Sequence, residues 1–113
     1  YIAEDRHTRT GIHRYIRSHY PLDDSVALYG SGLHTRLFIR ELKESGVRQL
    51  PVILSNGPSC ETVEGLTVLN GNTFDYNSVD KVIISSRSFE DEIYNRLVQH
   101  GIPASKIGRV YNR

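Results

Sequence analysis

The residues best suited to hold a ligand form a glycine-rich run, Gly30-Ser31-Gly32-Leu33-His34-Thr35. The run follows a short apolar stretch and precedes residues at helical spacing, which is the strand–turn–helix context that gives such a motif physical meaning. Gly30 permits a tight turn. The absent side chain at Gly32 lets an anion approach the first amides of the helix, where the helix dipole adds favourable potential. The run therefore predicts a site for a phosphate group.

Two positions depart from a dinucleotide-binding fingerprint. Thr35 stands where the third glycine would be, so the helix is expected to sit farther from the strand, although the threonine hydroxyl could donate to a phosphate. Ser55 and Asn56 stand where such folds place an acidic residue that accepts the ribose hydroxyls. Asparagine can still hydrogen-bond a ribose, but less strongly than a carboxylate. NAD-dependent redox chemistry is therefore disfavoured.

Other polar residues are expected around the same turn. His34 and Arg36 follow the glycines and could pair with a phosphate or carboxylate, the alternative being that one or both point to water. The segment 85–87 ends a strand expected beside the first one, so it would face the same crevice, with helix capping as the competing role of a serine. The predicted ligand-binding residues are Gly30, Ser31, Gly32, Leu33, His34, Thr35, Arg36, Ser55, Asn56, Ser85, Ser86 and Arg87.

No catalytic or metal-binding constellation accompanies this turn. The run 90–92 offers three adjacent carboxylates, but neighbours on a helix do not converge on one point, so they favour an interaction with the helix start. The five histidines lack the i, i+4 pairing of helical metal sites, and Cys60 has no neighbour that would activate it. The sequence predicts no catalytic residue and no metal site, and it specifies no cofactor.

Composition limits the protein class and its partners. The chain has 113 residues, 38% of them apolar, which suits a single domain with one core. Its net charge of +1 gives no field that argues for nucleic acid or a membrane surface. The single cysteine cannot form an internal disulfide, so a reducing cytoplasm is expected. The start at Tyr1 and the absence of methionine indicate either a segment of a longer chain, whose other domains would be its partners, or an engineered sequence.

The elements that must position the turn alternate along the chain. An amphipathic helix over 4–20 ends at Pro21, and strands are expected at 26–29, 50–54, 82–86 and 107–111. One helix follows the glycine turn and closes at 45–46. Another has its inner stripe at Phe89, Ile93, Leu97 and Val98, and 60–80 is expected to be loop with one small strand. This alternation predicts an α/β, three-layer domain with a mainly parallel sheet of about four to five strands.

Two segments carry a resemblance to a known family. The runs 26–36 and 82–94 resemble small Rossmann-like domains that accompany bacterial sugar-modifying enzymes, including sugar C-methyltransferases and polysaccharide-biosynthesis glycosyltransferases. Residues 64–69 are similar to a segment of nucleotide-sugar acyltransferase N-terminal domains, with Thr67 in place of a proline. The resemblance runs from about Val26 to Tyr111 and implies a Rossmann-like domain over 22–113, which the amphipathic helix expected within 1–21 precedes.

The resemblance also implies a function. It assigns the glycine turn to the phosphate of a nucleotide or nucleotide-sugar and places Ser55, Asn56 and Ser86 at the rim of the crevice. The expected function is a nucleotide- or nucleotide-sugar-binding module of a larger sugar-modifying or glycosyl-transferring protein, not catalytic by itself. A ligand-free scaffold or dimerisation domain is the alternative, in which two copies could pair, and an NAD-dependent oxidoreductase-like domain is the third hypothesis.

Overall fold

The computed structural model describes residues 2–18, 25–30, 32–46, 49–56, 62–86 and 88–111, with side chains described from residue 10 onward. The described strands form one six-stranded sheet in the order β3-β4-β2-β1-β5-β6. Every neighbouring pair is parallel except β3 with β4. The fold is therefore α/β with a mainly parallel sheet. The strands are β1 (Val26–Tyr29), β2 (Val52–Ser55), β3 (Thr62–Val63), β4 (Leu66–Asn70), β5 (Lys81–Ile84) and β6 (Ile107–Arg109).

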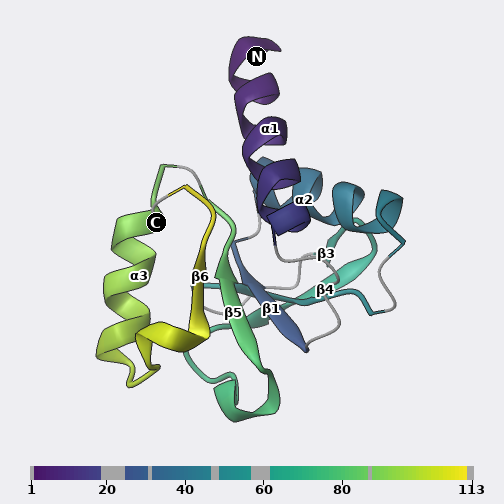
Figure 1. Cartoon of the computed structure of the whole chain (residues 1–113). Helices are drawn as coiled ribbons and strands as arrows, with labels where there is room; N and C mark the ends of the chain where they lie inside the picture. Colours follow the sequence, from purple (N-terminus) through teal and green to yellow (C-terminus); the bar gives the residue numbers. More distant parts are fainter. Residues whose placement is uncertain are drawn as a thin grey trace.

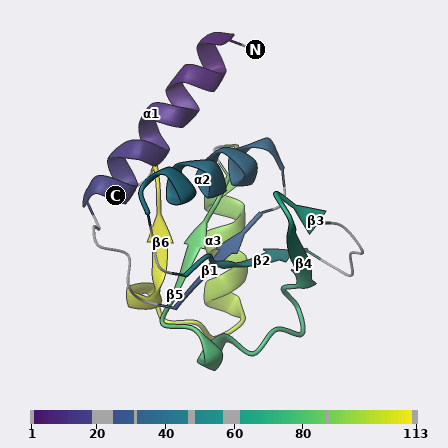
Figure 2. The same cartoon turned by 90° about the vertical axis from the view of Figure 1, so that its right-hand side faces the viewer.

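The helices cover the two faces of the sheet unequally. Helices α1 (Ile2–Ser18) and α2 (Leu33–Glu44) lie on one face, and α3 (Glu90–Gln99) lies on the other (Figures 1 and 2). The N-terminal part of α1 projects beyond the rest of the molecule in both views. Two short 3-10 helices, η1 (Tyr76–Ser78) and η2 (Ala104–Lys106), lie in the connections before β5 and before β6.

The central strands are apolar because both of their faces are buried. Leu28 and Ile83 pack with α1 and α2 on one side, while Ala27 and Val82 pack with α3 on the other. Alternate side chains of a strand point to opposite faces, so one short apolar run supplies two cores. Helix α1 adds Ile12, Tyr15 and Ile16 to the first core, at helical spacing.

The region between β2 and β5 contains more strand than the sequence predicted. Residues 62–70 form a hairpin in which Val63 pairs with Leu66. Its two-residue turn has positive φ at both positions, +49° at Glu64 and +85° at Gly65, a geometry that joins antiparallel strands with their natural twist. The prediction lacked β3 because a two-residue edge strand has too short a pattern to recognise.

The buried side of α3 differs from the predicted stripe. Phe89 and Val98 are 60% and 44% exposed, whereas Glu90 is buried with Ile93 and Leu97. Phe89 is the N-cap residue and precedes the first turn of the helix, so its ring is not part of the buried stripe. The expected stripe was therefore wrong at both ends. Glu90 can be buried at this position, where an apolar ring was expected, because its carboxylate is paired with Arg109 of β6.

Gly11 lies within α1 and does not interrupt the helix. A Cβ there would lie 2.6 Å from the ring of Tyr111, so glycine allows the helix to approach the end of the chain. The helix ends at Ser18, and the expected stop at Pro21 lies outside the described residues. None of the helices in the described part of the chain has the length and apolar character needed to cross a bilayer.

Candidate functional site

The glycine turn lies at the carboxyl edge of the parallel sheet, where β1 and β5 run side by side. The helix that follows β1 packs on one face of the sheet, and the helix that follows β5 packs on the other. The two connections therefore diverge directly above the ends of these strands. In open α/β sheets a crevice forms at such a divergence, because neither connection covers it.

Gly30 is required by the packing at this edge. Its φ is +141°, and a side chain there would clash with the carbonyl oxygen of Ser85. Its own N–H donates to the carbonyl oxygen of Leu54 at 2.8 Å. Gly30 therefore allows the ends of β1 and β5 to approach, and its amide is committed to β2.

Gly32 has a different role, as the N-cap of α2. Gly32 is exposed, and any residue can adopt its φ of −91°. No atom lies within 4 Å of the position that a Cβ would occupy. Its carbonyl oxygen accepts from Arg36 N at 3.2 Å, and no side chain caps the helix at this residue. Among the described residues, the N–H groups of Gly32 and Leu33 have no hydrogen-bond partner. They are the kind of donors that a phosphate or carboxylate can accept from.

The polar side chains that follow this turn point into the protein. His34 Nδ1 lies 2.8 Å from Ser85 Oγ, and His34 Nε2 lies 2.5 Å from the hydroxyl of Tyr111. Thr35 Oγ1 donates to Ser85 Oγ at 3.0 Å, and both of these side chains are buried. His34 is half-buried, and both of its ring nitrogens contact side chains of the protein. The four side chains form a hydrogen-bonded chain that fixes the first turn of α2 against β5 and the C-terminal segment.

Ser55 and Asn56 lie at the same edge, after β2. The carbonyl oxygen of Ser55 accepts from Gly71 N at 2.8 Å, and Asn56 Oδ1 accepts from Asn72 Nδ2 at 3.5 Å. Asn56 is exposed, and Ser55 is half-buried. The structure thus brings both residues to the same edge of the sheet as the glycine turn, where they connect β2 to the turn that follows β4.

The remaining predicted site residues are Ser31, Arg36, Ser86 and Arg87. Ser86 Oγ accepts from Phe89 N at 3.1 Å, which is a capping contact just ahead of α3. Arg36 is exposed on α2, and its charge helps Arg40 to lower the pKa of Glu64 below its usual value; the hydrogen bond that Arg40 donates to Glu64 is the largest cause. Ser31 and Arg87 lie outside the described residues.

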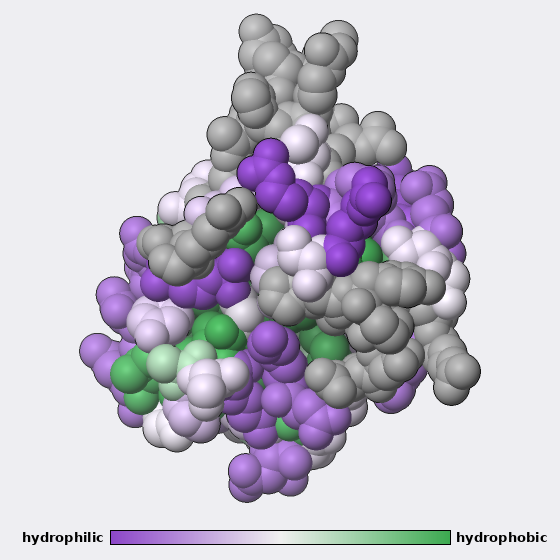
Figure 3. All heavy atoms as spheres, in the orientation of Figure 1, coloured by the Kyte–Doolittle hydropathy of each residue, from purple (hydrophilic) through white to green (hydrophobic). Residues whose placement is uncertain are grey.

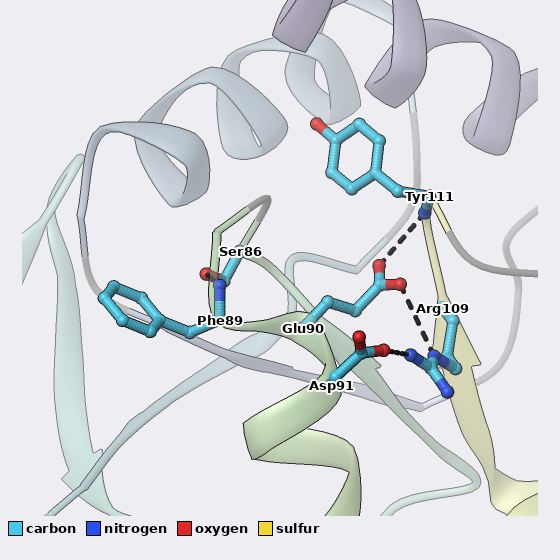
Figure 4. A network of polar contacts seen from close by, with 6 residues as sticks. All are labelled: Ser86, Phe89, Glu90, Asp91, Arg109 and Tyr111. Carbon is cyan, nitrogen blue, oxygen red and sulfur yellow. Dashed lines mark hydrogen bonds and ion pairs between the residues drawn. The ribbon is translucent and has the colours of Figure 1, made fainter.

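A second polar cluster joins α3 to β6 (Figure 4). Glu90 accepts from Arg109 Nε at 3.4 Å and from Tyr111 N at 3.0 Å, and Arg109 also donates to the carboxylate of Asp91. The Arg109 guanidinium lies 4.4 Å from the centre of the Tyr94 ring. The cluster explains why Glu90 can be buried, since a buried carboxylate needs both a counter-charge and hydrogen-bond donors.

Tyr111 is the residue that sequence reasoning missed. Its backbone binds Glu90, its hydroxyl binds His34, and its ring lies beside Gly11 of α1. In Figure 4 the ring points toward the helices of the first face, whereas Phe89 points away from the cluster. These partners are 21, 77 and 100 positions away in the sequence (111 − 90, 111 − 34 and 111 − 11), so no local pattern could have identified them.

Burial also alters the acidity of one phenol near the cluster. Desolvation raises the pKa of Tyr15 to about 12, and the negative charge of Glu90 adds to the increase. Tyr15 is therefore neutral at ordinary pH. Among the described residues, no group of three or more histidine, cysteine, aspartate or glutamate side chains could hold a metal ion.

Comparison with models of known protein families and with curated proteins finds no match for this chain.

Proposed function

We propose that this chain is a Rossmann-like module that binds a nucleotide or nucleotide-sugar, with phosphate held at the turn 30–32. The observation that carries the proposal is the place of Gly32. It starts α2 at the carboxyl edge of the sheet, where the connections after β1 and β5 diverge. A Cβ at Gly32 would meet no atom within 4 Å, and the N–H groups of Gly32 and Leu33 have no partner among the described residues.

The order of the parallel strands supports a Rossmann-like assignment. The parallel strands β1, β2, β4, β5 and β6 are the first to the fifth along the chain. Across the sheet they follow one another as third, second, first, fourth and fifth. Dinucleotide-binding folds share this order and bind their ligands at its reversal point, beside the first strand. The β3–β4 hairpin stands where such folds have a second crossover helix, so this chain would be a reduced version.

Residues near the turn suggest which part of a ligand each of them would bind. Phosphate would accept from the amides of Gly32 and Leu33, while Ser55 and Asn56 would meet a ribose on the β2 side. Leu33 and Phe89 are 58% and 60% exposed, so an exposed apolar side chain also lies at the start of α2 and another at the start of α3. We propose that such a module serves a larger sugar-modifying or glycosyl-transferring protein in the cytoplasm, with catalysis supplied by other domains.

One observation favours a ligand-free scaffold as the second candidate. His34 and Thr35, which a phosphate site would use, are both hydrogen-bonded within the protein. In a scaffold these contacts would serve only to fix α2 on the sheet, and the turn would stay empty.

Calorimetry separates the two candidates. UDP-glucose, dTDP-glucose, NAD, S-adenosylmethionine and coenzyme A are each titrated into the chain and into Gly32→Val. Valine at position 32 meets no other atom at Cβ and needs no left-handed φ, so the fold is expected to be retained while the approach to the amides is blocked. Saturable binding of a sugar nucleotide that Gly32→Val abolishes supports the proposal. No heat from any ligand at millimolar concentration supports the scaffold, and tight binding of NAD alone supports an oxidoreductase-like domain.

A further inference from the structure

A groove of about 770 Å³ runs along the edge strand β6, and none of its lining residues belongs to the glycine turn. Five consecutive residues, 107–111, form its floor. Helix α1 forms one wall with Gly11, Arg14, Tyr15 and Ser18, which share one face of the helix because they are spaced i, i+3, i+4 and i+7. Tyr94 of α3 lies on the opposite wall. The groove is therefore a trough with strand backbone at its base and a helix on each side.

The backbone at the base of the groove has hydrogen-bonding capacity to offer. Strand β6 pairs with β5 along one edge, and no strand in the described part of the chain pairs with its other edge. Alternate residues of an edge strand direct their N–H and C=O groups outward, which makes such an edge a template for another strand. Strand β6 has three residues, Ile107–Arg109, and three residues of extended chain span about 10 Å, enough for two main-chain hydrogen bonds.

The charge of the groove selects one kind of occupant. Arg14, Lys81 and Arg109 line it, and its described lining includes no aspartate or glutamate. Arg109 is already paired with Glu90 and Asp91, whereas Arg14 and Lys81 form no ion pair within the described residues. Two unneutralised cations beside a free strand edge favour a segment with carboxylates.

Other features argue against an apolar partner or a second copy of this chain. In Figure 3 hydrophilic residues gather around the lower part of α1, and hydrophobic atoms appear only in small separate areas of that face. Two copies joined through β6 would bring Arg109 and its neighbouring cations against the same set, and like charges across an interface oppose pairing.

We propose that the outer edge of β6 accepts an extended acidic segment of a partner protein as an added strand. Main-chain hydrogen bonds to residues 107–109 would give affinity, and Arg14 and Lys81 would select acidic side chains. This site is separate from the proposed nucleotide site, and neither depends on the other.

The test is an NMR titration of the ¹⁵N-labelled chain with three blocked hexapeptides. The first is the acidic strand peptide Thr-Glu-Val-Glu-Val-Thr, the second has lysine in place of glutamate, and the third keeps the glutamates but has proline in place of both valines. We expect saturable shifts of the amides of residues 107–111 with the first peptide and at least tenfold weaker binding of the other two. Proline keeps the charge but removes N–H donors, so it separates strand addition from simple attraction.

Matched variants assign the charge selection to the groove. Arg14→Glu and Lys81→Glu should each weaken binding of the acidic peptide at least tenfold. Arg17→Glu, an exposed position of α1 outside the groove, makes the same change of net charge and should alter binding less than twofold.

Several results would overturn the proposal. They are absence of saturable binding at millimolar peptide, equal binding of the acidic and basic peptides, full binding of the proline peptide, and an equal effect of Arg17→Glu. If inorganic phosphate alone shifts the same amides with the same dependence on Arg14 and Lys81, the groove is an anion site. If the chain without peptide self-associates and Arg14→Glu prevents it, the occupant is a second copy.

Discussion

Two glycines of one turn perform different tasks, although they are two positions apart in the chain. Gly30 has a left-handed backbone and no room for a side chain, because the carbonyl oxygen of Ser85 occupies that space. Gly32 has ordinary backbone angles and open space in front of it. The first glycine therefore serves the fold, and the second leaves access for a ligand.

This difference predicts opposite results for two alanine variants. Gly30→Ala should reduce the free energy of unfolding by roughly 3 kcal/mol, because it combines an unfavourable φ with a clash against backbone. Gly32→Ala should cost less than about 1 kcal/mol, since only the preference of the N-cap position changes. Urea denaturation followed by circular dichroism measures both. Equal losses in the two variants would show that the packing around Gly30 is not as described.

Tyr76 predicts how the protein responds to high pH. Its hydroxyl donates to the carbonyl oxygen of Gly71 at 2.6 Å, and burial, followed by the influence of Tyr29, raises its pKa to about 12. An unfolded tyrosine titrates near pH 10, so the stabilisation from the protonated phenol is present below about pH 10 and is lost as the pH rises toward about 12.

Tyr76→Phe tests this dependence. The variant should lose about 1 kcal/mol of stability at pH 8, because the hydrogen bond is gone. Its stability should fall less steeply than that of the unmodified chain between pH 10 and 12. Chemical denaturation at a series of pH values gives both quantities. A decline as steep as in the unmodified chain would mean that Tyr76 does not contribute to it.

At the scale of elements, the segment after β6 joins all three helices to one another. Tyr111 lies beside Gly11 of α1, its hydroxyl binds His34 of α2, and its amide binds Glu90 of α3. A buried polar chain of this kind fixes the relative positions of elements more specifically than apolar packing does. The orientation of the first turn of α2, where the proposed phosphate site begins, therefore depends on the C-terminal segment.

Tyr111→Phe measures this connection. The variant keeps the ring beside α1 but removes the hydroxyl that contacts His34, so it should lower the free energy of unfolding by about 1 kcal/mol. Tyr94→Phe is the matched control, because its ring still faces Arg109, and it should cost less than about 0.5 kcal/mol. Thermal and chemical denaturation of both variants give the comparison. If the two variants are equally stable, the contact with His34 does not hold α2.

At the scale of the whole molecule, the central strands and the helix after the glycine turn were predictable from sequence. Val26–Tyr29 and residues 82–84 of β5 are continuous apolar runs because strands buried on both faces need them. The expected neighbours β1 and β5 are confirmed as a parallel pair. Gly46, with φ of +74°, ends the region of α2 as the sequence indicated.

The side-chain directions at the candidate site were not predictable in the same way. His34 follows the glycine turn, but its ring binds Ser85 and Tyr111, which arrive from distant parts of the chain. The burial of Glu90 likewise depends on Arg109. Periodicity identifies elements because it is local, whereas these contacts arise only after the sheet has assembled.

The most direct test of the proposed function is an NMR titration of the ¹⁵N-labelled chain with UDP-glucose and dTDP-glucose, compared with Gly32→Val. We expect saturable shifts of the amides of Gly32 and Leu33 that are larger than those elsewhere in α2, and we expect these shifts to be lost in the variant. Unchanged resonances over residues 30–35 at millimolar ligand, or shifts that persist in Gly32→Val, would contradict a phosphate site at this turn.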